Sequence, residues 1–276
     1  MRSKIKGKVV LITGASSGIG AAAALAYDRA GAKVAIAARR REKLEQLAAG
    51  MNDPLVLQVD VSIEEEARRM IRETVSHYGR IDVLVNNAAL MIVTPAETVS
   101  RDDLLAAFHT NLLGAVSATQ EAIIQMKRQG GGQIINVGSP GFMMGIPFYS
   151  PYVCSKAALC AWTRTIQAEL AGSGIIVSEY FPGYILTDSK PVSRIGEVHQ
   201  DLLMSPKQNW LTRKFTKPKT PEYVAAQLIK LAKKPKVLTY SDPSVRIGAF
   251  ISNISGFRLS LSTQMAKTAR EKLAQR

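Results

Sequence analysis

The sequence predicts an α/β fold in which a doubly wound parallel sheet carries helices on both faces. Short apolar runs rich in β-branched residues alternate with longer segments of helical periodicity, which is the pattern of stacked βαβ units. A glycine-rich turn joins the first apolar run to an alanine-rich helix. No internal repeat or low-complexity segment interrupts the alternation, so we expect a single domain over residues 1–276.

The expected strands are short and almost continuously apolar, as is typical of strands that a parallel sheet buries on both faces. They are KVVLI (8–12), KVAIA (33–37), PLVLQV (54–59), DVLVN (82–86), QIINV (133–137) and IIVSEY (175–180). Helical periodicity predicts helices at 21–30, 101–129, 152–170 and 221–234. The alternation fails over residues 188–220, where scattered Pro, Ser, Lys and Trp predict an inserted lid.

Composition restricts the class of protein. With 46% apolar residues, the chain can bury a large core. Cys154 and Cys160 point to different faces of one predicted helix, which argues against a disulfide framework or a metal cluster and favours a reducing compartment. The N-terminal apolar run is too short for a signal peptide or a membrane span, so we expect a cytoplasmic protein. No metal site is expected, because the histidines are scattered at His77, His109 and His199.

The net charge of +14 and the pI near 9.9 leave two interpretations open. A basic surface could bind nucleic acid or an anionic surface, but the sequence contains no nucleic-acid-binding module, so no nucleic-acid partner is expected. The same residues could equally form an ordinary solvated surface. They are Lys207, Arg213, Lys214, Lys217, Lys219, Lys233, Lys234 and Lys236.

The glycine-rich turn is a candidate dinucleotide site. Gly14, Gly18 and Gly20 lie between a strand and a helix, where backbone N–H groups can bind a pyrophosphate and side chains would block its approach. After the second strand, where a carboxylate would bind an adenosine ribose, the sequence has three consecutive arginines instead. We therefore expect NADP(H) in preference to NAD(H), with Arg39 as the first choice for the 2′-phosphate contact and Arg40 beside it.

The stretch SPGFMMGIPFYSPYVCSK (139–156) contains two tyrosines before a lysine. Only Tyr152 lies four residues before Lys156, so only this pair shares one face of the predicted helix. Hydride transfer to a carbonyl leaves a developing alkoxide that needs a proton donor, and an ammonium nearby lowers the pKa of a phenol. Tyr152 and Lys156 are therefore the candidate catalytic pair, and Tyr149 belongs to the apolar stretch before them.

These motifs together resemble the short-chain dehydrogenase/reductase family over residues 7–188. TGASSGIG (13–20) resembles its cofactor loop, NNAA (86–89) resembles its NNAG motif with Ala89 in place of glycine, and PGYILT (182–187) falls where the family pattern places it. The family's final strand and glycine turn are not evident, and residues 241–276 match nothing in it. The resemblance implies a Rossmann-like fold and cofactor contacts from Gly14, Ser16, Ser17, Gly18, Ile19, Gly20, Arg39, Arg40, Asp60, Val61, Asn87, Ala88, Tyr152, Lys156, Pro182, Gly183 and Thr187.

The same resemblance implies a catalytic set of four residues. Tyr152 would supply the proton, and Lys156 would both tune this tyrosine and orient the nicotinamide ribose. Ser139 would hold the substrate oxygen, and Asn111 would place a water that relays protons. The expected activity is NADP(H)-dependent interconversion of a carbonyl and an alcohol; the alternative is a dinucleotide-sensing or scaffold protein of the same fold. A homodimer or homotetramer is also implied, through the helices at 101–129 and 152–170.

An apolar stretch between Ser139 and Tyr152 leaves two interpretations open. Its side chains could line a substrate pocket, as they do in the family, or pack as ordinary core. Together with the expected lid they suit an apolar substrate, whether sterol, retinoid, acyl chain or xenobiotic ketone. The stretch comprises Phe142, Met143, Met144, Ile146, Phe148 and Tyr149, and the lid adds Tyr184, Leu202, Leu203, Met204 and Trp210.

The C-terminal extension, about 241–276, is expected to be basic and amphipathic. Residues 205–276 carry fifteen Lys or Arg against three acidic residues. An apolar stripe recurs at helical spacing but is too polar to span a bilayer. It could dock onto its own domain or a second subunit, or settle with its basic flank on an anionic membrane. The stripe comprises Ile247, Phe250, Ile251, Ile254, Phe257, Leu261 and Met265.

Overall fold

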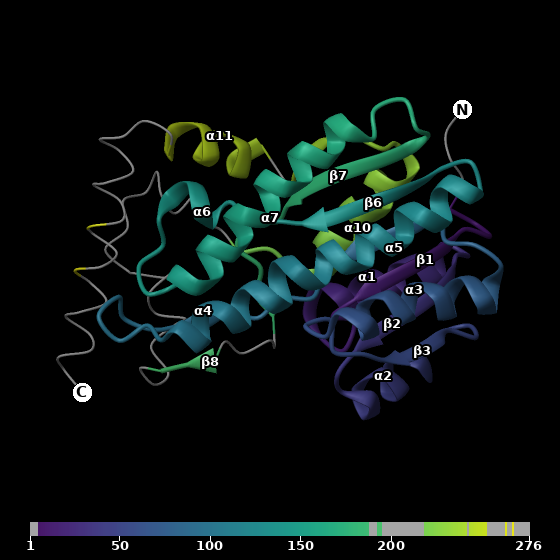
Figure 1. Cartoon of the computed structure of the whole chain (residues 1–276), viewed down its shortest axis with the longest axis horizontal. Helices are drawn as coiled ribbons and strands as arrows, with labels where there is room; N and C mark the ends of the chain where they lie inside the picture. The colour runs from purple at the N-terminus through teal and green to yellow at the C-terminus, as the bar shows by residue number, and fades with distance from the viewer. Residues whose placement is uncertain are drawn as a thin grey trace.

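The computed structural model describes residues 5–187, 192–194, 218–241 and 243–252, together with residues 263 and 267. Within this part of the chain, seven parallel strands form one sheet in the order β3-β2-β1-β4-β6-β7-β9 (Figure 1). The strands are β1 (Val9–Thr13), β2 (Lys33–Ala38), β3 (Leu55–Gln58), β4 (Val83–Asn86), β6 (Gly132–Val137), β7 (Ile175–Phe181) and β9 (Leu238–Tyr240). The strand order reverses between β1 and β4, so the predicted doubly wound fold is confirmed.

Helices cover both faces of the sheet. The face drawn toward the viewer in Figure 1 carries α3 (Glu64–Tyr78), α5 (Gly114–Arg128) and α7 (Ser150–Glu169), and the other carries α1 (Gly18–Arg29), α2 (Arg41–Ala48) and α10 (Pro221–Lys233). Along β1, Val10 and Ile12 pack with α1 and α10, whereas Leu11 packs with α3 and α5. Because successive side chains enter two different cores, the strand is apolar throughout, as the sequence predicts.

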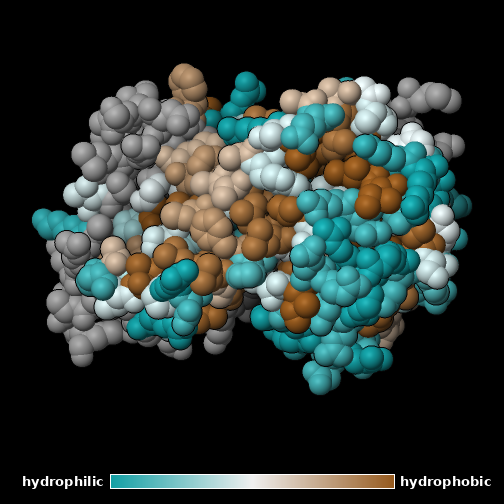
Figure 2. Space-filling model, in the orientation of Figure 1, coloured by the Kyte–Doolittle hydropathy of each residue, from teal (hydrophilic) through white to brown (hydrophobic). Residues whose placement is uncertain are grey.

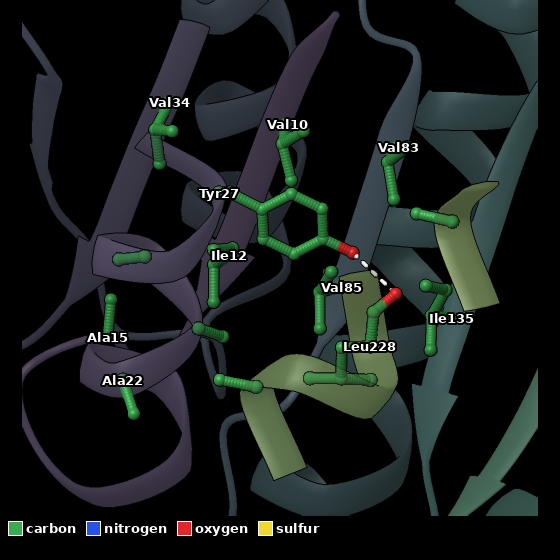
Figure 3. Close-up of a cluster of buried hydrophobic side chains, with 14 of the residues drawn as sticks. Val10, Ile12, Ala15, Ala22, Tyr27, Val34, Val83, Val85, Ile135 and Leu228 are labelled. Carbon is green, nitrogen blue, oxygen red and sulfur yellow. Dashed lines mark hydrogen bonds between the residues drawn. The ribbon is translucent and has the colours of Figure 1, made fainter. Parts of the chain in front are cut away.

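Tyr27 joins α1 to α10 in the core behind the sheet. Its side chain is fully buried, and its hydroxyl donates a hydrogen bond of 3.1 Å to the main-chain oxygen of Leu228 (Figure 3). Val10, Val34 and Val83, from three neighbouring strands, surround the ring. A buried tyrosine needs a partner for its hydroxyl. This bond therefore fixes α10 against the N-terminal half of the sheet.

A seventh strand, β9, is present after α10, although the final strand of the family is not evident in the sequence. β9 pairs in parallel with β7, where Glu179 aligns with Leu238 and Phe181 with Tyr240. The strand is three residues long and follows a run of lysines and a proline, so it lacks the apolar run by which the other strands are recognised. Its place at the edge of the sheet is compatible with such a short strand.

The predicted helix at 101–129 is confirmed, with one irregularity. α4 (Arg101–Phe108) continues through the π-helical turn η1 (His109–Leu113) into α5. Single π-helical turns inside longer helices occur frequently at functional sites. Two further helices, α6 (Gly141–Met144) and α11 (Pro243–Ser252), lie beyond the carboxyl ends of β6 and β7 in Figure 1. Among the described helices, none is long and apolar enough to cross a membrane.

The predicted lid falls largely outside the described residues, and so do Leu202, Leu203, Met204 and Trp210. The described residues on the two sides of the predicted lid are hydrogen-bonded to each other. Leu186 N–H donates to Lys219 O (3.0 Å), and Lys219 N–H donates to Tyr184 O (2.9 Å). Between them, β8 (Val192–Ser193) pairs in parallel with β5 (Ile92–Val93). Arg194 then forms a 2.7 Å ion pair with the buried Asp103 of α4. The described part of the segment between Tyr184 and Lys219 is thus attached to the domain where it begins and ends, and again at residues 192–194.

Candidate active site

The carboxyl ends of four neighbouring strands bring the candidate residues to one edge of the sheet. β1 leads into Gly14, β4 into Asn87, β6 toward Ser139 and β7 into Pro182. In doubly wound sheets, ligands bind in the crevice outside the carboxyl ends, where the strand order reverses. The candidate cofactor and catalytic residues therefore lie in the same region.

Ser139, Tyr152 and Lys156 meet at the end of β6. The Ser139 side chain hydrogen-bonds the Tyr152 hydroxyl and also accepts a 3.1 Å hydrogen bond from Gly141 N–H. Lys156 is buried, and its Nζ donates to the main-chain oxygen of Val137 at 2.7 Å. Tyr152 and Lys156 are one helical turn apart on α7, which begins at Ser150. The structure thus brings together three of the four candidate catalytic side chains.

Burial dominates the pKa values of this pair. It raises the pKa of Tyr152, and the hydrogen bond from Ser139 opposes this shift without cancelling it. It lowers the pKa of Lys156 to about 8. The sequence predicts that Lys156 lowers the pKa of Tyr152, but here the lysine Nζ donates to the Val137 carbonyl and the net shift of the Tyr152 pKa is upward.

Asn111 lies in η1 and is almost fully occupied by protein partners. Its Oδ1 accepts from Leu90 N–H (2.6 Å), and its Nδ2 donates to Leu90 O (2.9 Å) and to Ser155 Oγ (2.8 Å). Both amide hydrogens are therefore used, and one lone pair of Oδ1 remains. Asn111 clamps the segment after NNAA to α7, and its side chain can accept one hydrogen bond from a water but cannot donate to it.

The glycine turn has the shape that a dinucleotide site requires. Gly14 (φ +68°) and Gly18 (φ +55°) adopt left-handed backbone conformations that other residues rarely adopt. A Cβ on Gly20 would lie 2.3 Å from Gly14 O, so no side chain fits there. Thr13 Oγ1 accepts from the N–H groups of Asn87 and Ala88, both at 3.0 Å. The turn and the NNAA segment are thereby held together as one cradle.

The two arginines after β2 occupy different positions. Arg40 donates to the hydroxyls of Ser16 and Ser17 at 2.8 and 2.9 Å, so it already lies on the glycine turn. Arg39 is exposed, and its guanidinium is 3.9 Å from the carboxylate of Asp60. Ile19, at the start of α1, is partly buried, and Val61 is buried beside Asp60. Both arginines are thus beside the other expected cofactor contacts.

The order of these motifs along the chain matches a known family. The model of the family described as short chain dehydrogenase matches residues 8–196, which is more than half of the chain. The chain belongs to the short-chain dehydrogenase family.

The relatives of this short-chain dehydrogenase are named for at least two different activities. The 11-beta-hydroxysteroid dehydrogenase-like 4A of Arabidopsis thaliana is 39% identical over 213 residues, which cover 75% of this chain and 68% of that protein. The 3-oxoacyl-[acyl-carrier-protein] reductase FabG of Thermotoga maritima is 37% identical over 190 residues, which cover 67% and 76%. The crystal structure of a short-chain dehydrogenase from Streptomyces avermitilis superposes with a TM-score of 0.76 at 28% identity and covers 96% of this chain and 98% of that one.

The turn after β7 supplies the remaining expected cofactor contacts of this short-chain dehydrogenase. Pro182 is buried, and Gly183 N–H donates to Ser241 Oγ at 3.0 Å. A Cβ on Gly183 would lie 2.9 Å from the side chain of Val245, so α11 packs directly on this turn. Thr187 is partly buried and is the last described residue before β8. The first turn of the C-terminal extension therefore docks onto its own domain.

Tyr149 packs in a small apolar cluster of its own. Its side chain is 2% exposed and lies with Val93, against the partly buried Ile146 and Phe148. Burial, followed by the neighbouring Tyr184 and Tyr152, raises its pKa. Tyr149 is therefore near the candidate catalytic residue Tyr152 but held in a packed environment. Phe142 and Phe181 also pack together, with ring centroids 6.0 Å apart.

Several residues of this short-chain dehydrogenase site are not signalled by the sequence. The carbonyl of Val137, which receives Lys156, is a main-chain group and has no sequence signature. Asp103 and Arg194 are 91 residues apart, so only the fold brings them together. Cys160 could have been placed beside Lys156, since the two residues are four apart on one helix.

Proposed function

We propose that this short-chain dehydrogenase is an NADP(H)-dependent oxidoreductase that interconverts a carbonyl and an alcohol on an apolar substrate. The observation that carries the proposal is the convergence of Ser139, Tyr152 and Lys156 beside a glycine turn without room for side chains. The chemistry of this cradle fits a dinucleotide, because the tight packing at Gly14 and Gly20 brings the glycine turn close to the N-terminus of α1, where main-chain N–H groups can bind a pyrophosphate, and Arg40 adds positive charge beside it. When bound, the cofactor supplies or accepts the hydride.

The residues of the chain would handle the proton. In the reductive direction the Tyr152 hydroxyl gives its proton to the developing alkoxide, while the Ser139 hydroxyl donates a hydrogen bond to the same oxygen. The tyrosine is left as a phenolate, which the ammonium of Lys156, one helical turn away, would stabilise. In the oxidative direction the phenolate accepts the proton from the alcohol. Asn111 would hold a water through its free lone pair and so connect the site to solvent.

The cofactor preference rests on charge. Within the segment after β2, Arg39 and Arg40 precede the first carboxylate, Glu42. A 2′-phosphate between these guanidiniums would form charge-assisted hydrogen bonds that NAD(H) cannot form. Asp60, which faces Arg39, and Val61 would then flank the adenine.

The apolar substrate class is supported by the side chains near Tyr152 and by the names of the relatives. The relatives named 11-beta-hydroxysteroid dehydrogenase-like 4A and 3-oxoacyl-[acyl-carrier-protein] reductase FabG both have names that denote carbonyl or alcohol chemistry, on a steroid and on an acyl chain. We expect NADPH oxidation with at least one member of a panel of steroid ketones, 3-oxoacyl thioesters and simple aryl ketones. Absence of turnover across that panel, with NADPH binding intact, would favour the alternative of a dinucleotide-sensing or scaffold protein.

We propose that the chain is one domain over residues 1–276, with a lid at about 188–220 and a C-terminal extension at about 241–276. The main-chain hydrogen bond from Lys219 N–H to Tyr184 O supports the proposed boundaries of the lid, because it brings the two flanking segments together. Limited proteolysis should cut within the lid. The resulting fragments should remain associated and should unfold in a single cooperative transition.

We propose a homodimer, or a homotetramer containing that dimer, that packs through α4, α5 and α7. Figure 2 shows hydrophobic residues gathered over these helices. Leu105, Leu113 and Ile124 are each more than 40% exposed, and they are spread along the continuous helical run of α4, η1 and α5. Leu113→Asp should dissociate the oligomer in light scattering, whereas Ile63→Asp, at an equally exposed apolar position before α3, should not. Wild-type protein that scatters as a monomer at micromolar concentration would contradict the interface.

We place the protein in the cytoplasm with peripheral contact to an anionic membrane through α11. Val245 packs inward, but Ile247 and Phe250 are 46% and 75% exposed and line a shallow hollow with Arg246. The remainder of the predicted stripe lies outside the described residues. Sedimentation with anionic vesicles should be lost at high salt and in Ile247→Ser/Phe250→Ser, whereas neutral vesicles should not bind. Equal binding of anionic vesicles by this variant and by wild type, or no binding by wild type, would contradict the membrane contact. The role of α11 would then be to pack against its own domain.

A further inference from the structure

A ladder of polar side chains runs along one face of α7, from Tyr152 through Lys156 and Cys160 to Arg164. Successive members are four residues apart, so each lies one turn above the last. The proposed reaction uses only the first two. Glu179 of β7 faces the other two, and the reaction assigns it no role.

Glu179 is an unusual residue for the interior of a parallel strand. Its side chain is 2% exposed, and its Oε2 accepts a 3.2 Å hydrogen bond from Nε of Arg164, whose own side chain is 53% exposed. Its Oε1 is buried and accepts no hydrogen bond from a nitrogen or oxygen donor of the described residues, and the remaining partner of the carboxylate is the thiol of Cys160, a weak donor. A buried carboxylate that is held by one exposed arginine and one weak donor destabilises the fold relative to an apolar residue. Stability alone therefore does not explain a carboxylate at this position.

Cys160 lies between Glu179 and the catalytic pair. Its Sγ is 3.3 Å from where a Cβ on Gly138 would be, and the preceding residue, Val137, receives Nζ of Lys156. Burial first, and then the charge of Glu179, raise the pKa of Cys160, so its thiol stays neutral. Carboxylate, neutral thiol and ammonium are therefore consecutive neighbours at the end of β6.

We propose that Glu179 is a positioning residue whose buried negative charge, acting past the thiol of Cys160, keeps Lys156 protonated behind Tyr152. The inference rests on the proposed function, in which Lys156 acts as an ammonium. Arg164 orients the carboxylate, and its guanidinium, on a side chain that is 53% exposed, is screened by solvent more than the buried carboxylate is. The titratable groups that face this cluster from the packed elements are Tyr152, Cys160 and Arg164 of α7, Tyr240 of β9 and Arg246 of α11.

The test is the pH dependence of turnover in Glu179→Gln, which keeps the shape of the side chain and removes its charge. Lys156 is charged below its pKa of about 8, so activity that needs this charge falls as the pH rises through that value. Loss of the nearby negative charge favours deprotonation, and the alkaline limb of the kcat profile should move down by about one pH unit. Glu179→Asp, which restores the charge, should move it back. Glu169→Gln removes a carboxylate from the exposed end of α7 and should leave the limb in place.

A second measurement separates this inference from the proposed function. Ultraviolet titration of tyrosinate needs no substrate, and the contribution of Tyr152 is obtained by difference from Tyr152→Phe. Glu179→Gln should lower this pKa, because removal of a negative charge favours the phenolate. A folded Glu179→Gln in which neither the alkaline limb nor the tyrosinate titration moves overturns the role of Glu179. Absence of carbonyl turnover in wild type, with the titration shift present, overturns only the proposed function.

A variant that removes the whole ion pair covers the case in which Glu179→Gln does not fold. Buried ion pairs are often replaced by apolar side chains without loss of stability. Glu179→Met combined with Arg164→Met should therefore fold and should show the same downward shift, since it removes the same buried carboxylate together with a guanidinium that solvent already screens. An unshifted profile in this folded variant contradicts the inference.

Discussion

Tyr152→Phe should reduce carbonyl turnover by about 10²–10⁴-fold while leaving NADPH binding unchanged. The substitution removes the hydroxyl that hydrogen-bonds Ser139 and leaves the ring on α7 in place. The glycine turn that would bind the phosphates is held by Thr13, Asn87 and Ala88, and none of these contacts involves Tyr152. Steady-state kinetics measure the loss of kcat, and quenching of protein fluorescence by NADPH measures binding.

Tyr149→Phe is the matched control for this prediction. Tyr149 lies three residues before Tyr152 in a separate apolar cluster, with its ring almost fully buried. Loss of its hydroxyl should leave turnover within a few-fold of wild type, because neither Ser139 nor Lys156 contacts it in the described hydrogen bonds. An inactive Tyr149→Phe together with an active Tyr152→Phe would reverse the assignment of the proton donor.

Arg39→Ala should weaken NADPH binding by about 10- to 100-fold and NADH binding far less. The exposed guanidinium near Asp60 is free to contact a 2′-phosphate, and charge-assisted hydrogen bonds contribute about 1.5–3 kcal/mol. NADH has no phosphate at that position, so it loses only a general electrostatic attraction. Fluorescence titrations with both cofactors at one ionic strength measure the difference.

Two neighbouring arginines serve as comparisons. Arg41→Ala removes the same charge, but this side chain pairs with Glu45 on the exposed face of α2 at 2.7 Å, so both cofactors should bind as before. Arg40→Ala should weaken both cofactors, because Arg40 also braces the hydroxyls of Ser16 and Ser17. Equal losses of NADPH and NADH in Arg39→Ala would refute its assignment to the 2′-phosphate.

Much of the fold could be predicted because its signals are local. Six of the seven strands in the main sheet are apolar on both sides, so their composition identifies them without knowledge of their partners. The Tyr152 and Lys156 pair is likewise local, since helical geometry alone places residues four apart on one face. β9 escaped prediction because its three residues are recognisable only by their pairing with β7.

The parts of the site that could not be predicted depend on contacts between distant segments. The upward shift of the Tyr152 pKa follows from how deeply α7 is buried against β6, which no spacing reveals. The occupation of Asn111 depends on Leu90 and Ser155, which lie 21 and 44 residues away in the chain. Glu179 illustrates the same limit, because its sequence position in an apolar strand says nothing of the helix it faces.

The four-residue spacing along α7 has a consequence for how this segment can change in length. Each residue added to a helix rotates everything after it by about 100°. A single insertion between Tyr152 and Arg164 would therefore turn the later members of the ladder away from β6 and β7 while leaving the earlier members in place. A point substitution alters the contacts of one side chain. An insertion or deletion between Tyr152 and Lys156 would instead move Lys156, Cys160 and Arg164 together away from the face of α7 that Tyr152 occupies. We expect that α7 accepts many replacements on its exposed face and no change in the number of residues.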